Sequence, residues 1–507
     1  MISDELKYRI LQDFGHEPTE EQSQALDEFC RFMVDKDSHS VMILRGSAGT
    51  GKTTLAGAVV RALTRLGQKL ILMAPTGRAA KVFALYAGHE AFTIHRRIYR
   101  QMSAADFSSF SLNDNLFHDT LFIVDEASMI SNGGESIFGS GCLLDDLMQY
   151  VYSGERCRLM LIGDKAQLPP VGEQQSAALT ASALRGYGMT VFECDLNQVL
   201  RQSEDSGILW NATRIRGLGG RLKVEGGGNI ALPQIRFEGF NDIQVMMGND
   251  LVESLASSYS RVGMDETIVV TRSNKRANIY NQGIRNTVLD REEELCRGDR
   301  LMIVKNNYFY QMKDEKLEVR DERYDNQTNG ENNGVQGDQI SHFSPLISNF
   351  IANGDCVIVQ RVRHVHEQYG FRFAEVTMTF PDYDDYELTA FVILDTLTSE
   401  APSLTREQQQ QLFEAVLEDY SWVVRKDERM KKLKTDKYYN ALQVKFAYAV
   451  TCHKAQGGQW SHVYVDQGYM TDDMLNTDYI HWLYTAFTRA TEKLFLVNWP
   501  KTQIEES

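Results

Sequence analysis

One short stretch carries the clearest chemical pattern: Gly46-Ser-Ala-Gly-Thr-Gly-Lys52-Thr53 matches G-x-x-x-x-G-K-[ST]. An apolar run at Ser40–Leu44 precedes it, and helical periodicity follows it as far as Leu66. Between a strand and a helix, such glycines let backbone N–H groups close around phosphate oxygens. Lys52 would neutralise the β- and γ-phosphates of ATP, and Thr53 would hold Mg²⁺. The residues expected to bind the nucleotide here are Gly46, Gly49, Gly51, Lys52, Thr53 and Thr54.

Two further groups of polar residues follow apolar runs. Asp125 and Glu126 come directly after Leu121–Val124. An Asp at such a place can bind Mg²⁺, often through water, and the adjacent Glu can orient or deprotonate an attacking water. Gln167 lies in a proline-stiffened loop after Arg158–Ile162, where it can reach a γ-phosphate. An Asp-Glu pair alone is typical of a solvated turn, but beside a phosphate loop it indicates hydrolytic chemistry.

The elements that must position these residues alternate between short apolar runs and helical stretches. This pattern predicts an α/β protein with parallel sheets, whose ligands bind beyond the carboxyl ends of the strands. Thr19 is a plausible capped start for a helix near the N-terminus. The expected strands are Ser40–Leu44, Lys69–Ala74, Leu121–Val124 and Arg158–Ile162 in a first sheet, then Thr267–Val270 and Leu494–Val497 in a second.

The second α/β unit is interrupted. Residues 311–346 are polar and predict an exposed loop. Residues 354–397 alternate apolar and polar residues, which indicates a small β-barrel-like module. Residues 404–440 look helical and hold a basic run, Arg425–Lys437, that is diluted by acidic residues. That run is as compatible with a solvated helix face as with a DNA contact.

Composition sets weaker bounds. The chain has 507 residues, of which 43% are hydrophobic and 24% charged, as expected of a globular protein. Its net charge of −16 counts mildly against nucleic-acid binding, which depends on where Lys and Arg gather. Seven cysteines without C-x-x-C spacing argue against a disulfide framework or a zinc ribbon. Without a signal-type or membrane-spanning run, a cytoplasmic location is expected.

The strings DEAS at Asp125 and GDKAQLPPV at Gly163 resemble those of superfamily 1 helicases, in particular the 5′-to-3′ branch (superfamily 1B) that contains RecD and Dda. Further motifs follow in the order of that family. They are PTEEQ ending at Gln22, APTGRAA at Ala74–Ala80, TIHR at Thr93–Arg96, LNQVLRQ at Leu196–Gln202, AYAVTCHKAQGGQW at Ala447–Trp460 and LYTAFTRA at Leu483–Ala490. The resemblance leaves out the stretch from Asn307 to Asn440.

The resemblance implies roles for residues that spacing alone does not assign. Gln22 would recognise adenine, and Arg201 and Arg489 would be arginine fingers. An arginine supplied by a second domain stabilises the charge of phosphoryl transfer, so both would couple the state of ATP to domain closure. With them, the expected catalytic residues are Lys52, Glu126, Gln167, Arg201 and Arg489, and the expected metal ligands are Thr53 and Asp125.

Single-stranded DNA would then lie across both motor domains. Hydroxyls, backbone N–H groups and cations bind phosphates without reading sequence. The expected contacts are Thr76, Arg78, Thr93 and His95 in the first domain and Thr451, His453 and Lys454 in the second. A structural, hydrogen-bonded role is a real alternative for both histidines. Candidates for base stacking are Phe92, Phe107, Phe110 and Trp460, although a lone aromatic is more often a core residue.

The implied fold is two RecA-like parallel-sheet motor domains with a small hairpin insertion and an SH3-like β-barrel insertion. The boundaries expected are 1–195 for the first motor domain, with the hairpin at about 99–119, 196–306 plus 441–507 for the second, and 307–440 for the inserted barrel and its polar loop.

The expected function is therefore an ATP-dependent DNA helicase that moves 5′ to 3′ on single-stranded DNA. It would act as a monomer at junctions of duplex and single strand, in DNA repair or recombination. Two alternatives stay open. An RNA helicase of the same superfamily would differ only in contacts to the 2′-OH. A P-loop ATPase switch that binds a protein partner would not need the nucleic-acid motifs.

Overall fold

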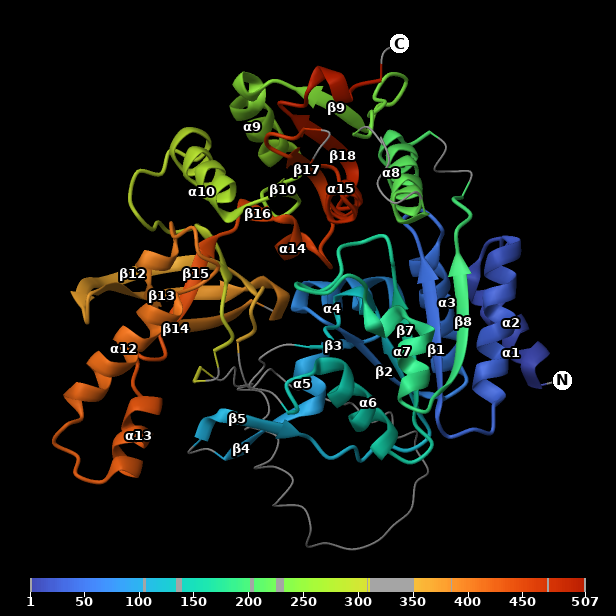
Figure 1. The fold of residues 1–507 in the computed structure, drawn as a ribbon, viewed down its shortest axis with the longest axis horizontal. Helices are drawn as coiled ribbons and strands as arrows, with labels where there is room; N and C mark the ends of the chain where they lie inside the picture. Colours follow the sequence, from blue (N-terminus) through green and yellow to red (C-terminus); the bar gives the residue numbers. More distant parts are fainter. Residues whose placement is uncertain are drawn as a thin grey trace, which may run out of the picture.

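The computed structural model describes residues 2–103, 106–133, 139–200, 205–224, 232–307, 309–310, 351–383, 385–471 and 474–505. Two parallel sheets and a closed barrel form three bodies in Figure 1. The first sheet lies on the right, the second at the top and the barrel on the left. Within the described ranges, no helix is long and apolar enough to cross a membrane. All seven cysteines are free thiols.

The first sheet has six parallel strands in the order β3-β2-β6-β7-β1-β8. Successive residues of β1 point into two different cores, Val41 and Ile43 into one and Met42 and Leu44 into the other. Burial on both faces explains why its strands read as continuous apolar runs. The strands are β1 (Ser40–Gly46), β2 (Lys69–Ala74), β3 (Ala91–Thr93), β6 (Thr120–Val124), β7 (Arg158–Gly163) and β8 (Thr190–Leu196).

Helices cover both faces of this sheet. The second helix begins with the capping box that its sequence predicts, since the Thr19 side chain accepts from the Gln22 N–H and the Gln22 side chain accepts from the Thr19 N–H. The helices are α1 (Ile2–Phe14), α2 (Glu20–Val34), α3 (Lys52–Arg65), α4 (Gly77–Ala87), α5 (Ile94–Ile98), α6 (Leu143–Ser153) and α7 (Ala181–Gly186).

The second sheet is also wholly parallel, in the order β16-β10-β17-β18-β9. Its strands are β9 (Ile243–Met246), β10 (Thr267–Thr271), β16 (Ala449–Thr451), β17 (Trp460–Asp466) and β18 (Ala490–Val497). The accompanying helices are α8 (Gly207–Val224), α9 (Leu251–Arg261), α10 (Asn274–Gly283), α14 (Cys452–Ala455) and α15 (Thr477–Phe487). Two RecA-like sheets are therefore present, as the sequence predicts.

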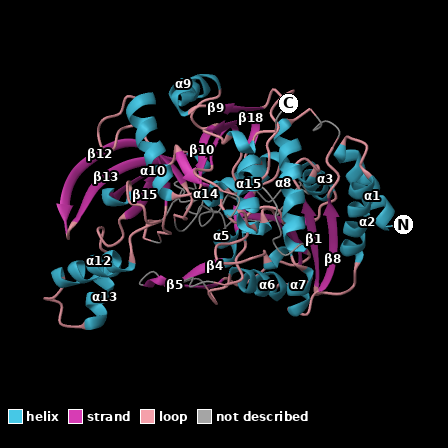
Figure 2. Ribbon diagram, turned by 45° about the horizontal axis from the view of Figure 1, so that its top comes forward, coloured by secondary structure: helices cyan, strands magenta, loops and turns pink. Residues whose placement is uncertain are grey.

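The barrel closes through five strands, β11 (Arg300–Ile303), β12 (Cys356–Gln368), β13 (Phe371–Phe380), β14 (Tyr386–Ile393) and β15 (Leu442–Phe446). The alternating stretch 354–397 forms β12 to β14, which confirms the predicted barrel, while β11 and β15 flank residues 307–440. Helices α12 (Arg406–Asp419) and α13 (Lys426–Lys434) extend from the barrel toward the hairpin β4 (Tyr99–Ser103) and β5 (Asp106–Leu112), as Figure 2 shows. This hairpin confirms the predicted insertion. The polar loop 311–346 lies outside the described residues.

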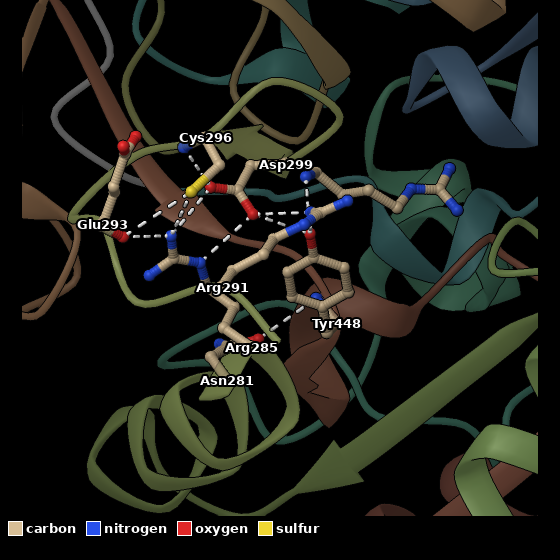
Figure 3. A network of polar contacts seen from close by, with 8 residues as sticks. Asn281, Arg285, Arg291, Glu293, Cys296, Asp299 and Tyr448 are labelled. Atoms are coloured by element: carbon tan, nitrogen blue, oxygen red, sulfur yellow. Dashed lines mark hydrogen bonds and ion pairs between the residues drawn. The ribbon is translucent and has the colours of Figure 1, made fainter. Parts of the chain in front are cut away.

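A buried polar network joins the barrel to the second sheet (Figure 3). Asp299, which is fully buried, accepts from Arg285 at 3.1 and 3.0 Å, from Arg291 at 2.7 Å and from the Tyr448 hydroxyl at 2.9 Å. Asn281 accepts from the backbone N–H of Tyr448 at 3.1 Å. Because Tyr448 lies between β15 and β16, these contacts fix the barrel to the strand that leads into α14.

Candidate nucleotide and nucleic-acid sites

The phosphate loop connects β1 to α3 and closes on itself. Gly49 and Gly51 have φ values of +77° and +74°, in the left-handed region that glycine adopts without strain. A Cβ on Gly51 would lie 2.6 Å from the Gln22 amide nitrogen, so a larger residue there would displace the Gln22 side chain. Lys52 Nζ donates to the Gly46 carbonyl at 3.3 Å. The loop thus has the concave backbone that phosphate oxygens require.

Gln22 holds this loop from the side. Its amide nitrogen donates to the Thr50 carbonyl at 2.9 Å and its amide oxygen accepts from the Thr19 N–H at 2.9 Å. The side chain is buried. Gln22 therefore supports the phosphate loop directly, and its role toward adenine stays a prediction.

A cavity of about 430 Å³ lies between the two motor domains, within the usual ~300–1,000 Å³ of ligand pockets. The first domain supplies most of the predicted nucleotide residues to its wall. The second domain supplies residues of the motifs that end in Trp460 and Ala490. The residues that line the cavity include Gly49, Gly51, Lys52, Thr53, Asp125, Glu126, Gln167, Gly457, Gln459 and Arg489. Residues far apart in the sequence thus converge on one cavity.

The acidic pair lies at the carboxyl end of β6, as predicted. Asp125 is 9% exposed, and its Oδ1 accepts from the Glu126 N–H at 2.8 Å. Burial is the main cause that raises the pKa of Asp125, and the neighbouring Glu126 raises it further. The charge of Lys52 opposes this rise. Glu126 itself has φ +52°, a strained conformation that tends to occur at functional sites. A hard cation beside Asp125 and Thr53 would relieve the desolvation of this carboxylate, so the donor set fits Mg²⁺.

Gln167 bridges the two domains inside the cavity. In the amide orientation that satisfies both neighbours, its nitrogen donates to Glu126 Oε2 at 3.3 Å and its oxygen accepts from Arg489 Nη2 at 3.2 Å. Arg489 follows α15 in the second domain and is only 2% exposed. Three of the predicted catalytic residues therefore form one chain of contacts across the cleft. Arg201, the other predicted arginine finger, lies outside the described residues.

A tyrosine that the sequence did not single out closes the same cleft. The Tyr484 hydroxyl accepts from the Ala48 N–H of the phosphate loop at 2.9 Å and donates to Asp164 at 2.6 Å. Burial raises the pKa of Asp164. Thr485, the next residue of α15, accepts from the Leu168 N–H at 2.9 Å. Tyr484 lies within the quoted LYTAFTRA string, but nothing in its spacing indicates contacts with a loop more than 400 residues away.

The predicted DNA contacts of the first domain lie at the starts of α4 and α5. Thr76 and Thr93 each cap a helix, accepting from backbone N–H groups at 3.2 and 3.3 Å. Arg78 reaches the second domain, where it donates to the Gln459 carbonyl at 2.8 Å and lies 4.3 Å from the ring centroid of Trp460. Burial lowers the pKa of His95 to about 4. His95 is therefore neutral at pH 7 and would not offer a positive charge to a phosphate.

The candidates of the second domain lie on α14 and at its cap, Thr451. His453 is exposed, and desolvation lowers its pKa. Lys454 donates to the Asn353 side chain at the edge of the barrel, and burial lowers its pKa to about 8. The side chains of the stacking candidates Phe107 and Phe110 lie outside the described residues.

Comparisons with known proteins agree with this arrangement. The family model described as an AAA domain matches residues 17–217, and the model described as a UvrD-like helicase C-terminal domain matches residues 446–497. The ATP-dependent RecD2 DNA helicase of Deinococcus radiodurans is 32% identical over 191 residues, which is 38% of this chain and 23% of that protein. The ATP-dependent DNA helicase Dda of Enterobacteria phage T4 is 26% identical over 295 residues, or 55% of this chain and 60% of that protein.

The aligned stretches thus span less than two thirds of either relative. Among solved structures, the Pif1 helicase from Bacteroides, in complex with ADP-AlF3 and single-stranded DNA, covers 97% of this chain and 95% of its own, with 14% identity and a TM-score of 0.44. The two family models match the two halves of the nucleotide cavity, and the RecD2 and Dda alignments agree with the ordered motifs. Over these stretches the chain is similar to superfamily 1B helicases of the RecD and Dda type.

Proposed function

We propose that this protein is an ATP-dependent DNA helicase that translocates 5′ to 3′ on single-stranded DNA and unwinds duplex DNA. The chain of contacts from Glu126 through Gln167 to Arg489 carries the proposal, because it links the acidic pair beside the phosphate loop to an arginine from a second domain. An ATPase that only bound and released nucleotide would not need an arginine delivered by domain closure.

The proposed hydrolytic step uses residues of both domains. The phosphate loop and Lys52 bind the β- and γ-phosphates of ATP. Thr53 and Asp125 would hold Mg²⁺, which neutralises phosphate charge. Glu126 orients a water for attack on the γ-phosphorus and takes its proton, while the bond from that phosphorus to the β–γ bridging oxygen breaks and ADP leaves. Gln167 contacts both Glu126 and Arg489 and so senses whether the γ-phosphate is present.

The proposed motor action follows from two groups of residues that would bind the DNA strand, here called the two grips. Thr76, Arg78 and Thr93 belong to the first domain, and Thr451, His453 and Lys454 to the second. Closure around ATP would bring the grips together, and opening after hydrolysis would separate them. The relatives named ATP-dependent DNA helicases support DNA as the partner. Action as a monomer in the cytoplasm and use in repair or recombination belong to the same proposal. So do the domain boundaries given above, with the barrel extended to include β11 and β15.

ATP turnover is expected to rise at least about tenfold when single-stranded DNA is added, since both grips flank the cavity. The measurement is phosphate release with oligo-dT, with oligo-rU and without nucleic acid, followed by unwinding of 5′- and 3′-tailed duplexes. Stimulation by RNA alone would favour an RNA helicase, and no stimulation would favour a partner-binding switch. Unwinding of the 3′-tailed duplex alone would contradict the proposed direction.

Binding of single-stranded DNA is expected to weaken as the pH rises from 7 to 9. Lys454, with its pKa lowered to about 8, is mostly charged at pH 7 and mostly neutral at pH 9. A bound phosphate favours the charged form, so this contribution is present below pH 8 and is lost above it. Cys356, which also acts on Lys454, has its pKa raised to about 11 and stays neutral over this range.

The measurement is oligo-dT affinity against salt concentration at each pH. Loss of one cation contact should reduce the logarithmic salt slope by about 0.7 for a single strand. The matched variant is Lys454→Arg, whose charge persists over this range and should remove most of the pH dependence. An equal pH dependence in both proteins would show that Lys454 does not bind phosphate.

A further inference from the structure

Tyr86, in the last turn of α4, contacts the carboxylate proposed to bind the metal. Its hydroxyl donates to Asp125 Oδ2, and the other oxygen, Oδ1, accepts from the Glu126 N–H at 2.8 Å. Each oxygen of Asp125 thus has one donor. A carboxylate offers about four lone-pair sites, so one on each oxygen is left for a metal or its water.

The position of Tyr86 is fixed by α3, the helix that begins with Lys52 and Thr53. The Tyr86 carbonyl accepts from Arg61 Nη1 at 3.1 Å. A Cβ on Gly57 of α3 would lie only 2.8 Å from that carbonyl oxygen, so the two helices approach closely at this point. The backbone of Tyr86 is therefore held by the same helix that begins with Lys52, the lysine proposed to bind phosphate.

The hydrogen bond between Tyr86 and Asp125 has one direction. Ala79, Val82 and Tyr86 lie on one face of α4 and line the cavity. A carboxylate only accepts hydrogen bonds, so the Tyr86 hydroxyl is the donor to Asp125 Oδ2.

We propose that Tyr86 is a positioning residue whose hydroxyl sets the orientation of the Asp125 carboxylate for Mg²⁺. The inference rests on the proposed ATPase function and adds a residue that lies outside every motif quoted above. Hydrogen-bond partners of metal ligands fix ligand orientation, and their loss typically weakens metal affinity by about 10–100-fold.

The test is Mn²⁺ binding to the full chain in the presence of ADP, followed by electron paramagnetic resonance. Tyr86→Phe removes only the hydroxyl and should raise the half-saturating Mn²⁺ concentration about tenfold. ADP binding in EDTA, measured by calorimetry, should equal that of the wild type, because no metal is then involved. The matched control is Tyr152→Phe: its hydroxyl donates to the Ser40 carbonyl at 2.8 Å, at the opposite end of β1 from the phosphate loop.

Asp125→Asn separates the two ways in which the inference can fail. Unchanged Mn²⁺ binding in this variant would remove Asp125 from the metal site and overturn the proposed catalytic assignment as well. Loss of binding in Asp125→Asn, with Tyr86→Phe within twofold of the wild type, would overturn the role of Tyr86 alone. Weakened ADP binding in EDTA by Tyr86→Phe would mean that the tyrosine shapes the whole cavity and does not act on Asp125.

Discussion

Replacement of Lys52 by alanine is expected to abolish ATP hydrolysis, lowering kcat by at least about 10²–10³-fold. Two effects add. The charge proposed to bind the β- and γ-phosphates is lost, and Asp125 and Asp164 lose the cation that opposes the rise of their pKa. Both carboxyl groups are buried, so each would then protonate more readily.

The measurement is phosphate release at saturating ATP, with nucleotide binding followed separately. Lys36→Ala, which removes an exposed lysine from the segment between α2 and β1, is the matched control and should retain wild-type turnover. Normal turnover by Lys52→Ala would contradict the assignment of the phosphate loop as the ATP site.

The second large effect is expected for Arg489→Ala, which should keep ATP binding but lose turnover by about 10³-fold or more, as for other arginine fingers. Arg489 is buried in the second domain and contacts Gln167 across the cleft. Arg489→Lys retains the charge but not the planar fork, so intermediate turnover is expected.

A double-mutant cycle makes this prediction sharper. Because Arg489 and Gln167 are in contact, their alanine variants should be non-additive by about 0.5–3 kcal/mol in the barrier to hydrolysis. Additive effects would mean that the contact does not serve catalysis. Arg489 also donates to the Thr485 and Gly458 carbonyls, both at 3.0 Å. Loss of nucleotide binding in Arg489→Ala would therefore identify it as a structural residue.

The sequence predicts buried strands well where the side chains on both faces of the strand are apolar. Each of the six expected strands lies within an observed one, and Lys69–Ala74 is matched to the residue. β17 was missed because polar side chains occupy its buried positions. His462 and Tyr464 are buried there, and each has a hydrogen bond to Ser258 of α9, at 2.8 and 2.7 Å. Such compensation comes from a distant helix and leaves no periodic apolar signal in the strand.

The residues of the candidate site likewise fall into those that the sequence predicts and those that it does not. Residues in loops that follow strands could be predicted, because the carboxyl ends of parallel strands meet at one edge of the sheet. Tyr86 and Tyr484 could not, because a lone tyrosine within a helix is ordinarily a core residue. Nor could the sequence indicate that Arg78 faces Trp460, since that contact depends on how the two motor domains meet.

The buried network around Asp299 has a mechanical consequence. Because Asp299, Arg285 and Tyr448 are each at most 2% exposed and joined by hydrogen bonds, the junction they form is stiff. A force on the barrel would then be transmitted through Tyr448 to β16 and α14 with little deformation of the junction. The barrel and α14, the helix proposed to bind the DNA strand, would move as one rigid unit. The length of a step would then be set by the hinge between the motor domains and not by deformation within the second domain.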